Sequence, residues 1–193
     1  MQPGKIITLS QTTNAAKDVQ SELYQIGLWN EGTKLWNAHI YVTSIPLFTM
    51  ASAGAIFTHG VSSFYKFFGF EVGHIYIPKW VLAQGFWQNR GSLRDIIRHE
   101  YGHVLAHYYP ELIQHCLQFE RVFGGHYFDA CPSSMNRNSY ISDYACTMPC
   151  EDFAETFMVF VRRKGKKPIG MNDEKLIKKW DYIQAVCKKI SKY

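Results

Sequence analysis

The sequence lacks an apolar run long enough to cross a bilayer, because residues 45–57 fall well short of the roughly 20 residues that a membrane helix needs. It also lacks the apolar core of a signal peptide near its start. Long linkers, low-complexity tracts and internal repeats are absent too. These absences predict one domain over residues 1–193, with no transmembrane segment, that is cytoplasmic or exported without a cleaved signal peptide.

Cysteines are few, and their number, five, is odd. No two of them have C-x-x-C spacing, which favours reduced thiols and a reducing compartment. The five are Cys116, Cys131, Cys146, Cys150 and Cys187.

The composition is that of a folded chain, with 47% hydrophobic and 16% aromatic residues. The net charge is +5, and the positive residues are densest in residues 162–167. Such a run can attract an acidic substrate, a nucleic acid or an anionic membrane, although it is more often a solvated helix end. Because no nucleic-acid-binding motif accompanies it, no nucleic-acid partner is expected.

One short segment carries most of the chemical information: His99-Glu100-Tyr101-Gly102-His103 has the form H-E-x-x-H. Residues four apart on a helix are neighbours, so both imidazoles can reach one metal ion. The intervening glutamate lies beside them, where it can take a proton from metal-bound water. The motif predicts a zinc-dependent hydrolase, with a peptidase as the first choice. The alternative is a helix that carries two surface histidines by chance.

The residues around the motif predict a helix that ends before Pro110. Ser92 or Gly91 can cap its start, and Asp95 lies in the first turn, where the helix dipole favours an anion. The helix has an apolar stripe on a face different from that of the two histidines. Its members are Ile97, Tyr101, Val104 and Tyr108.

A catalytic zinc ion usually has three protein ligands, so a third one is needed. One class of zinc peptidases has a glycine and a further histidine after the motif, but Ala106 and Tyr109 occupy those positions here. His107 continues the helical spacing, yet it lies about 12 Å along the axis from His99, too far to share one ion. We expect His107 to be structural or solvent-facing.

Glu151 is the better candidate for the third ligand, at the start of a predicted helix opened by Pro149. Glu155 follows one turn later on the same face, and two neighbouring carboxylates repel each other unless a cation lies between or near them. A zinc ion is such a cation, and Glu155 can then orient a ligand histidine by a hydrogen bond. The alternative is that Glu151 only favours the start of a helix.

The pair of segments HEYGH (residues 99–103) and EDFAE (residues 151–155) resembles the gluzincins. The likeness is greatest to the catalytic domain of anthrax lethal factor and to related bacterial zinc-binding metallopeptidases. It is close over about residues 95–163 and upstream concerns only the order of the elements. The resemblance implies a zincin-like fold with an edge strand over the active-site helix.

The resemblance also implies roles for individual residues. Glu151 matches the third zinc ligand of the family, and Glu155 matches the acid that supports a ligand. A tyrosine seven residues before the third ligand stabilises the oxyanion in the lethal-factor-like domain, and Tyr144 holds that position here. The alternative for Tyr144 is a packing role.

Together these residues predict a zinc-dependent endopeptidase that acts on a peptide or protein. His99, His103 and Glu151 would hold Zn²⁺, which lowers the pKa of a bound water to about 7. Glu100 would act as the general base, with Tyr144 stabilising the oxyanion. The alternatives are a non-peptidase zinc hydrolase and a non-catalytic, zinc-stabilised binding or regulatory protein. The oligomeric state is not predicted.

Strands early and helices late predict an α+β fold, with a small N-terminal sheet and a mainly helical second half. Residues 73–77 are the candidate edge strand that pairs with substrate, although an ordinary sheet strand is an equal alternative. Within this strand, His74 could face the site or simply pack.

The loop over residues 123–147 either borders the active-site cleft or is a packed surface excursion. Other helices are expected at residues 15–29, 61–68, 111–122 and 173–190, and other strands at residues 38–42 and 55–58.

Overall fold

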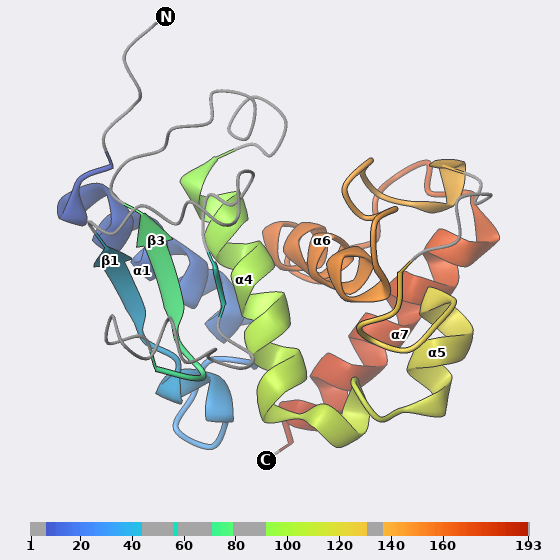
Figure 1. The fold of residues 1–193 in the computed structure, drawn as a ribbon, viewed down its shortest axis with the longest axis horizontal. Helices are drawn as coiled ribbons and strands as arrows, with labels where there is room; N and C mark the ends of the chain where they lie inside the picture. The colour runs from blue at the N-terminus through green and yellow to red at the C-terminus, as the bar shows by residue number, and fades with distance from the viewer. Residues whose placement is uncertain (1–6, 44–55, 58–70, 79–91, 131–136, 193) are drawn as a thin grey trace, which may run out of the picture.

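The protein has an α+β fold in which helices predominate, as the sequence predicts. The computed structural model describes residues 7–43, 56–57, 71–78, 92–130 and 137–192. A small sheet and α1 lie on one side of the central helix α4, and α5, α6 and α7 lie on the other (Figure 1). The elements are α1 (Leu9–Gln25), η1 (Lys34–Asn37), β1 (Ile40–Thr43), β2 (Ile56–Phe57), β3 (Ile75–Pro78), α4 (Leu93–Tyr108), η2 (Pro110–Leu112), α5 (Leu117–Phe123), η3 (Arg137–Ser139), α6 (Pro149–Arg162) and α7 (Glu174–Ile190).

The sheet has the order β1-β3-β2, which decides between the two alternatives for residues 73–77. β3 pairs in parallel with β1 and antiparallel with β2, so it is an ordinary central strand and not the candidate edge strand. Its consecutive residues Ile75, Tyr76 and Ile77 are all buried, as is usual for a strand covered on both faces. The strand that lies against α4 at the edge of the sheet is β2.

The helix α4 forms because both its start and its end are specified locally. Ser92 accepts a hydrogen bond from the Asp95 backbone N–H, and the Asp95 side chain accepts one in return from the Ser92 N–H. The helix ends at Tyr108, before Pro110. Between these ends, residues 95–106 are all buried, because α1 packs on one side and α6 on the other.

Gly102, inside the H-E-x-x-H motif, allows α6 to approach α4 closely. A Cβ atom at this position would come within 2.9 Å of the Ala154 Cα. Real Cβ atoms do not reach such distances, so any larger residue would force the helices apart. The two small residues therefore bring the ligand-bearing surfaces of α4 and α6 together.

Two predicted helices have different bounds in the structure. The first helix begins at Leu9, earlier than expected, because Thr8 forms a capping box with Gln11, and the chain turns away at Gly27, whose φ is +77°. The helix expected over residues 111–122 is confirmed only from Leu117, because the preceding segment forms η2 and turns. The helix predicted for residues 61–68 lies outside the described residues.

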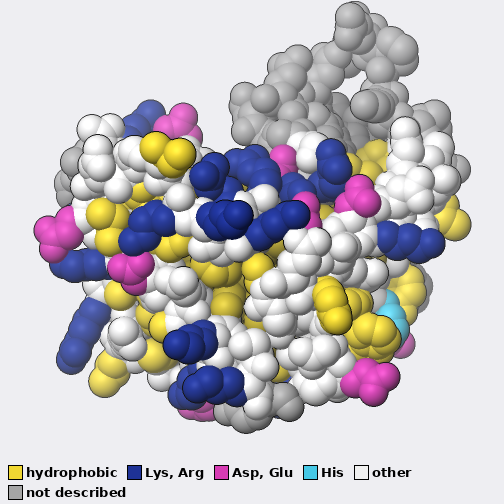
Figure 2. All heavy atoms as spheres, turned by 180° about the vertical axis from the view of Figure 1, so that it is seen from behind, with side chains coloured by type: hydrophobic (Ala, Val, Ile, Leu, Met, Phe, Trp, Pro, Cys, Tyr) yellow, Lys and Arg dark blue, Asp and Glu magenta, His cyan; other side chains and the backbone are white. Residues whose placement is uncertain are grey.

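Exposed basic residues follow α6, as expected for a solvated helix end. Some of their charge is paired, since Lys167 Nζ lies 2.9 Å from Asp181 Oδ1 and Arg162 Nη1 lies 3.4 Å from Asp95 Oδ1. Figure 2 shows Lys and Arg side chains gathered in a band on the rear face of the molecule.

None of the helices in the described part of the chain is both long and apolar enough for a membrane span.

A buried ion pair fastens α7 to the start of α6. Lys179 Nζ lies 2.7 Å from Asp152 Oδ2, donates to the Ser139 carbonyl at 2.7 Å, and lies 4.0 Å from the centre of the Tyr140 ring. Burial raises the pKa of Asp152 to about 6, although the Lys179 ammonium acts in the opposite direction. The residue after Glu151 is therefore held by a cation from another helix.

We predict that Lys179→Met lowers the free energy of unfolding by about 3–5 kcal/mol at about pH 8, because Asp152 is left buried without its cation. Without the ammonium, the pKa of Asp152 rises further above 6, so the folded state binds a proton by about pH 5 and the loss is smaller there. Urea unfolding of the wild type and the variant at both pH values measures the change in the free energy of unfolding.

The matched control is Lys178→Met, which removes an exposed lysine one residue earlier on the same helix. Its effect should stay within about 0.5 kcal/mol. Equal losses for the two variants, or a loss at Lys179 that does not depend on pH, would contradict the role of the ion pair.

Candidate metal centre

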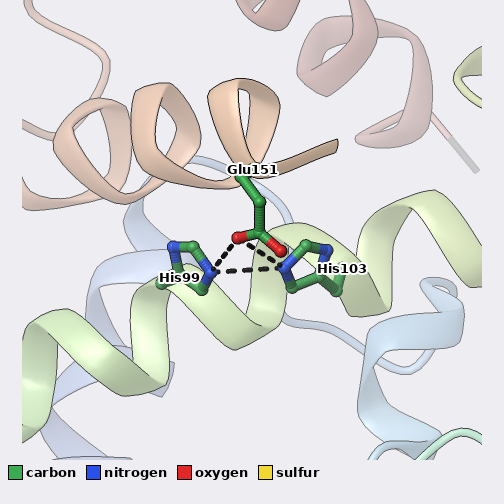
Figure 3. Close-up of side chains that lie close together, drawn as sticks. All are labelled: His99, His103 and Glu151. Carbon is green, nitrogen blue, oxygen red and sulfur yellow. Dashed lines mark hydrogen bonds and ion pairs between the residues drawn. The ribbon is translucent and has the colours of Figure 1, made fainter. Parts of the chain in front are cut away.

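Three side chains from two helices converge at one buried point, as Figure 3 shows. His99 and His103 extend from α4, and Glu151 extends from the first turn of α6. The two histidine Nε2 atoms are 3.2 Å apart, and Glu151 Oε2 lies 3.1 Å from His99 Nε2 and 3.6 Å from His103 Nε2. The structure thus brings together the three ligands predicted from the sequence.

The size of this triangle suits a small metal ion. Tetrahedral bonds of about 2.1 Å place neighbouring donor atoms about 3.4 Å apart, close to the three distances observed. The two nitrogen donors and one carboxylate oxygen also match the kinds of ligand that zinc takes in catalytic sites. No second group of this kind occurs within the described ranges.

The site requires positive charge, because a carboxylate oxygen and two imidazole nitrogens face one another out of water. Glu151 Oε2 is buried, and the polar atoms that the structure places beside it are the Nε2 atoms of His99 and His103. Burial lowers the pKa of His99, but hydrogen bonds to Glu151 and Glu155 and the charge of Glu100 outweigh it and raise that pKa to about 10. Burial also opposes ionisation of Glu151, yet the two histidines hold its pKa far below the usual range. The same negative surroundings that raise the pKa of His99 also favour a metal cation at this point.

A carboxylate fixes the orientation of the His99 ring. Glu155 Oε1 lies 2.7 Å from His99 Nδ1, and Ser142 Oγ donates to Glu155 Oε2 at 2.7 Å. When His99 Nδ1 donates its proton to Glu155, Nε2 is left with a free electron pair that points at the centre. Glu155 thus occupies the position that its predicted supporting role needs, and Ser142 extends the chain of hydrogen bonds.

The second histidine has a different partner, Tyr127. Its hydroxyl oxygen lies 3.0 Å from His103 Nδ1, and its ring is fully buried. Burial raises the pKa of Tyr127 well above the ordinary value, so its hydroxyl stays neutral. Sequence reasoning assigned no role at the site to either Tyr127 or Ser142, because both lie in a loop without periodicity that could indicate which side chains turn inward.

The two predicted catalytic residues lie beside the ligands. Glu100 is buried, and its charge is among the contributions that raise the pKa values of His99 and Tyr127. The ring of Tyr144 is half-buried, and its centre lies 5.9 Å from that of His99. Because Tyr127 and Tyr144 both belong to the loop over residues 123–147, the described part of this loop borders the metal centre, which was one of the two alternatives.

Two other histidines considered from the sequence are not part of the centre. His74 Nδ1 accepts a hydrogen bond from the His39 backbone N–H, and its Nε2 lies 3.4 Å from Glu71 Oε2, so it packs at the sheet. His107 packs against Tyr108 near the end of α4, and burial lowers its pKa. The cysteines among the described residues, Cys116, Cys146, Cys150 and Cys187, form no disulfide with one another, and Cys131 lies outside those residues.

Comparison of the chain with models of known protein families, with curated proteins and with solved structures finds no match. The resemblance to the gluzincins therefore depends on the two motifs and their spacing. A function for this protein has to be inferred from the geometry and chemistry of its own site.

We predict that Glu151→Ala lowers the affinity for zinc by more than about 100-fold, because loss of a ligand should exceed the 10–100-fold effect typical of an outer partner. Competition with a chromophoric chelator measures the dissociation constant. Glu111→Ala removes an exposed carboxylate just after α4 and should leave the affinity unchanged. Equal affinities for the wild type and Glu151→Ala would mean that the third ligand is a different residue.

Proposed function

We propose that this protein is a zinc-dependent endopeptidase of the gluzincin type. The observation that carries the proposal is the buried triangle of His99 Nε2, His103 Nε2 and Glu151 Oε2. Three protein donors leave a fourth position for water or substrate, which distinguishes a catalytic zinc site from a structural one with four protein ligands. Peptide hydrolysis is supported further by the buried acid Glu100, which lies next to a ligand in the sequence.

When bound, zinc supplies a Lewis acid that activates water for attack on a carbonyl carbon. Glu100 accepts the proton of the attacking water at its carboxylate and passes it to the leaving nitrogen. Its burial removes competing water and strengthens its electrostatic effect on the reacting groups. Glu155 and Ser142 keep the His99 ring in one orientation during these steps.

Tyr144 supplies the second stabilising group in this mechanism. Its ring lies beside His99 and is half-exposed, as is suitable for a side chain that must meet a substrate. The phenol donates a hydrogen bond to the oxyanion that forms when water attacks the peptide carbonyl. The proposed substrate is a peptide or a protein, whose scissile carbonyl would lie within reach of both Tyr144 and the zinc site.

The activity is tested by cleavage of a diverse peptide library, read by mass spectrometry, with zinc-loaded wild type and zinc-loaded Glu100→Gln. We predict cuts with the wild type and at least about 10²-fold slower cleavage with Glu100→Gln, because the variant cannot accept the proton. The glutamine should leave zinc bound, because Glu100 is not among the three ligands.

Equal cleavage by the two proteins would contradict the role of Glu100. No cleavage by a wild type that holds zinc would contradict the endopeptidase. It would favour either a zinc hydrolase for non-peptide substrates or a non-catalytic protein that zinc stabilises.

We predict that Tyr144→Phe lowers kcat by about 10²-fold with little change in KM, because it removes a hydrogen bond made only in the transition state. Zinc content should not change. Tyr41→Phe, at an exposed tyrosine on β1, is the control and should keep full activity. A Tyr144→Phe variant with unchanged kcat would leave Tyr144 only a packing role.

A further inference from the structure

Tyr127 makes contact with both helices that carry the ligands. Its hydroxyl oxygen lies 3.0 Å from Nδ1 of His103, which belongs to α4. Its backbone carbonyl accepts a hydrogen bond of 3.0 Å from the N–H of Cys150, which belongs to the first turn of α6. One residue in a loop thus joins the second ligand to the element that carries the third.

The contact with Cys150 holds the first turn of α6. The first N–H groups of a helix have no partner within the helix, and each must find one elsewhere. The Tyr127 carbonyl satisfies the N–H of Cys150, and the next residue along the chain is the ligand Glu151. A shift of Tyr127 would therefore move the backbone from which the third ligand extends.

The contact with His103 controls which ring nitrogen carries a proton. His103 Nε2 can bind a cation only when it has a free electron pair, so the proton of the neutral ring must be on Nδ1. The oxygen of Tyr127 then accepts a hydrogen bond from the Nδ1–H group. A phenylalanine in its place would leave the same buried nitrogen without this acceptor.

The surroundings of the Tyr127 ring hold its hydroxyl in one place. The ring centre lies 5.5 Å from that of Phe119 and 4.9 Å from that of Phe128. Phe119 itself stacks on Phe123, with a centre-to-centre distance of 4.6 Å. Phe119 and Phe123 both belong to α5, so this short helix supports the Tyr127 ring beside the candidate metal centre.

We propose that Tyr127 is a positioning residue for the metal site. Its hydroxyl keeps the proton of His103 on Nδ1, and its backbone carbonyl fixes the place of Glu151. This inference rests on the proposed function, of which it uses only the binding of zinc. The arrangement is uneven, since a carboxylate supports His99 and a neutral phenol supports His103. The phenol holds the second ring without adding another negative charge to a site that already contains several carboxylates.

The test compares zinc binding by the wild type, Tyr127→Phe and Tyr182→Phe, with dissociation constants from chelator competition. Tyr182 is a matched control, because its ring packs against Phe123, as part of the same aromatic cluster, while its hydroxyl donates to the Leu112 carbonyl. We expect Tyr127→Phe to weaken zinc binding by about 10–100-fold and Tyr182→Phe to leave it unchanged.

A second measurement reports on the hydrogen bond itself. In zinc-loaded protein, NMR should show the Nδ1 proton of His103 protected from exchange with water in the wild type. We expect this proton to exchange faster in Tyr127→Phe, while the Nδ1 proton of His99 keeps its protection, because Glu155 is unchanged.

The outcomes separate the inference from the proposed function. Wild-type affinity in Tyr127→Phe, with zinc bound by both proteins, would overturn the role of Tyr127 and leave the zinc site intact. An equal loss in Tyr182→Phe would also overturn it, because the effect would then belong to the aromatic packing. A wild type that binds no zinc would overturn the inference and the proposed function together.

Discussion

The structure is organised around a concentration of electron-pair donors that is unfavourable without a cation. His99, His103 and Glu151 turn their donor atoms toward one another in a buried space. A buried carboxylate is costly without a cation, and two imidazole nitrogens 3.2 Å apart both present electron pairs when neither carries a proton. A zinc ion would satisfy all three groups at once, and this supports the proposed metal site.

The fold makes that concentration possible by holding two helices unusually close. Gly102 and Ala154 let α4 and α6 approach, and the pair of Lys179 with Asp152 fixes the first turn of α6 from the far side. Phe119 packs against both Phe123 and Tyr127, and the Tyr127 carbonyl accepts a hydrogen bond from the same turn. The sheet lies on the opposite side of α4 and gives that helix a second packed face (Figure 1). Both faces of α4 are thus fixed, and its histidines have little freedom to move apart.

The sequence could predict features that repeat or that have a local cause. The positions of the two histidines follow from helical spacing, and Glu151 and Glu155 follow from the cost of placing two carboxylates on one helix face. The sequence could not predict which loop side chains turn toward the site, so Tyr127 and Ser142 emerged only from the structure. The sequence also left open whether β3 is an edge strand or an ordinary strand of the sheet, because strand pairing joins residues far apart in the chain.

The central claim is that one zinc ion is held by His99, His103 and Glu151. A crystal structure of the zinc-loaded protein, with anomalous diffraction recorded on both sides of the zinc absorption edge, tests it most directly. We predict one anomalous peak within about 2.0–2.2 Å of the two Nε2 atoms and a Glu151 carboxylate oxygen. Zinc found only at other residues, or a zinc-free triangle in crystals grown with excess zinc, would contradict the claim.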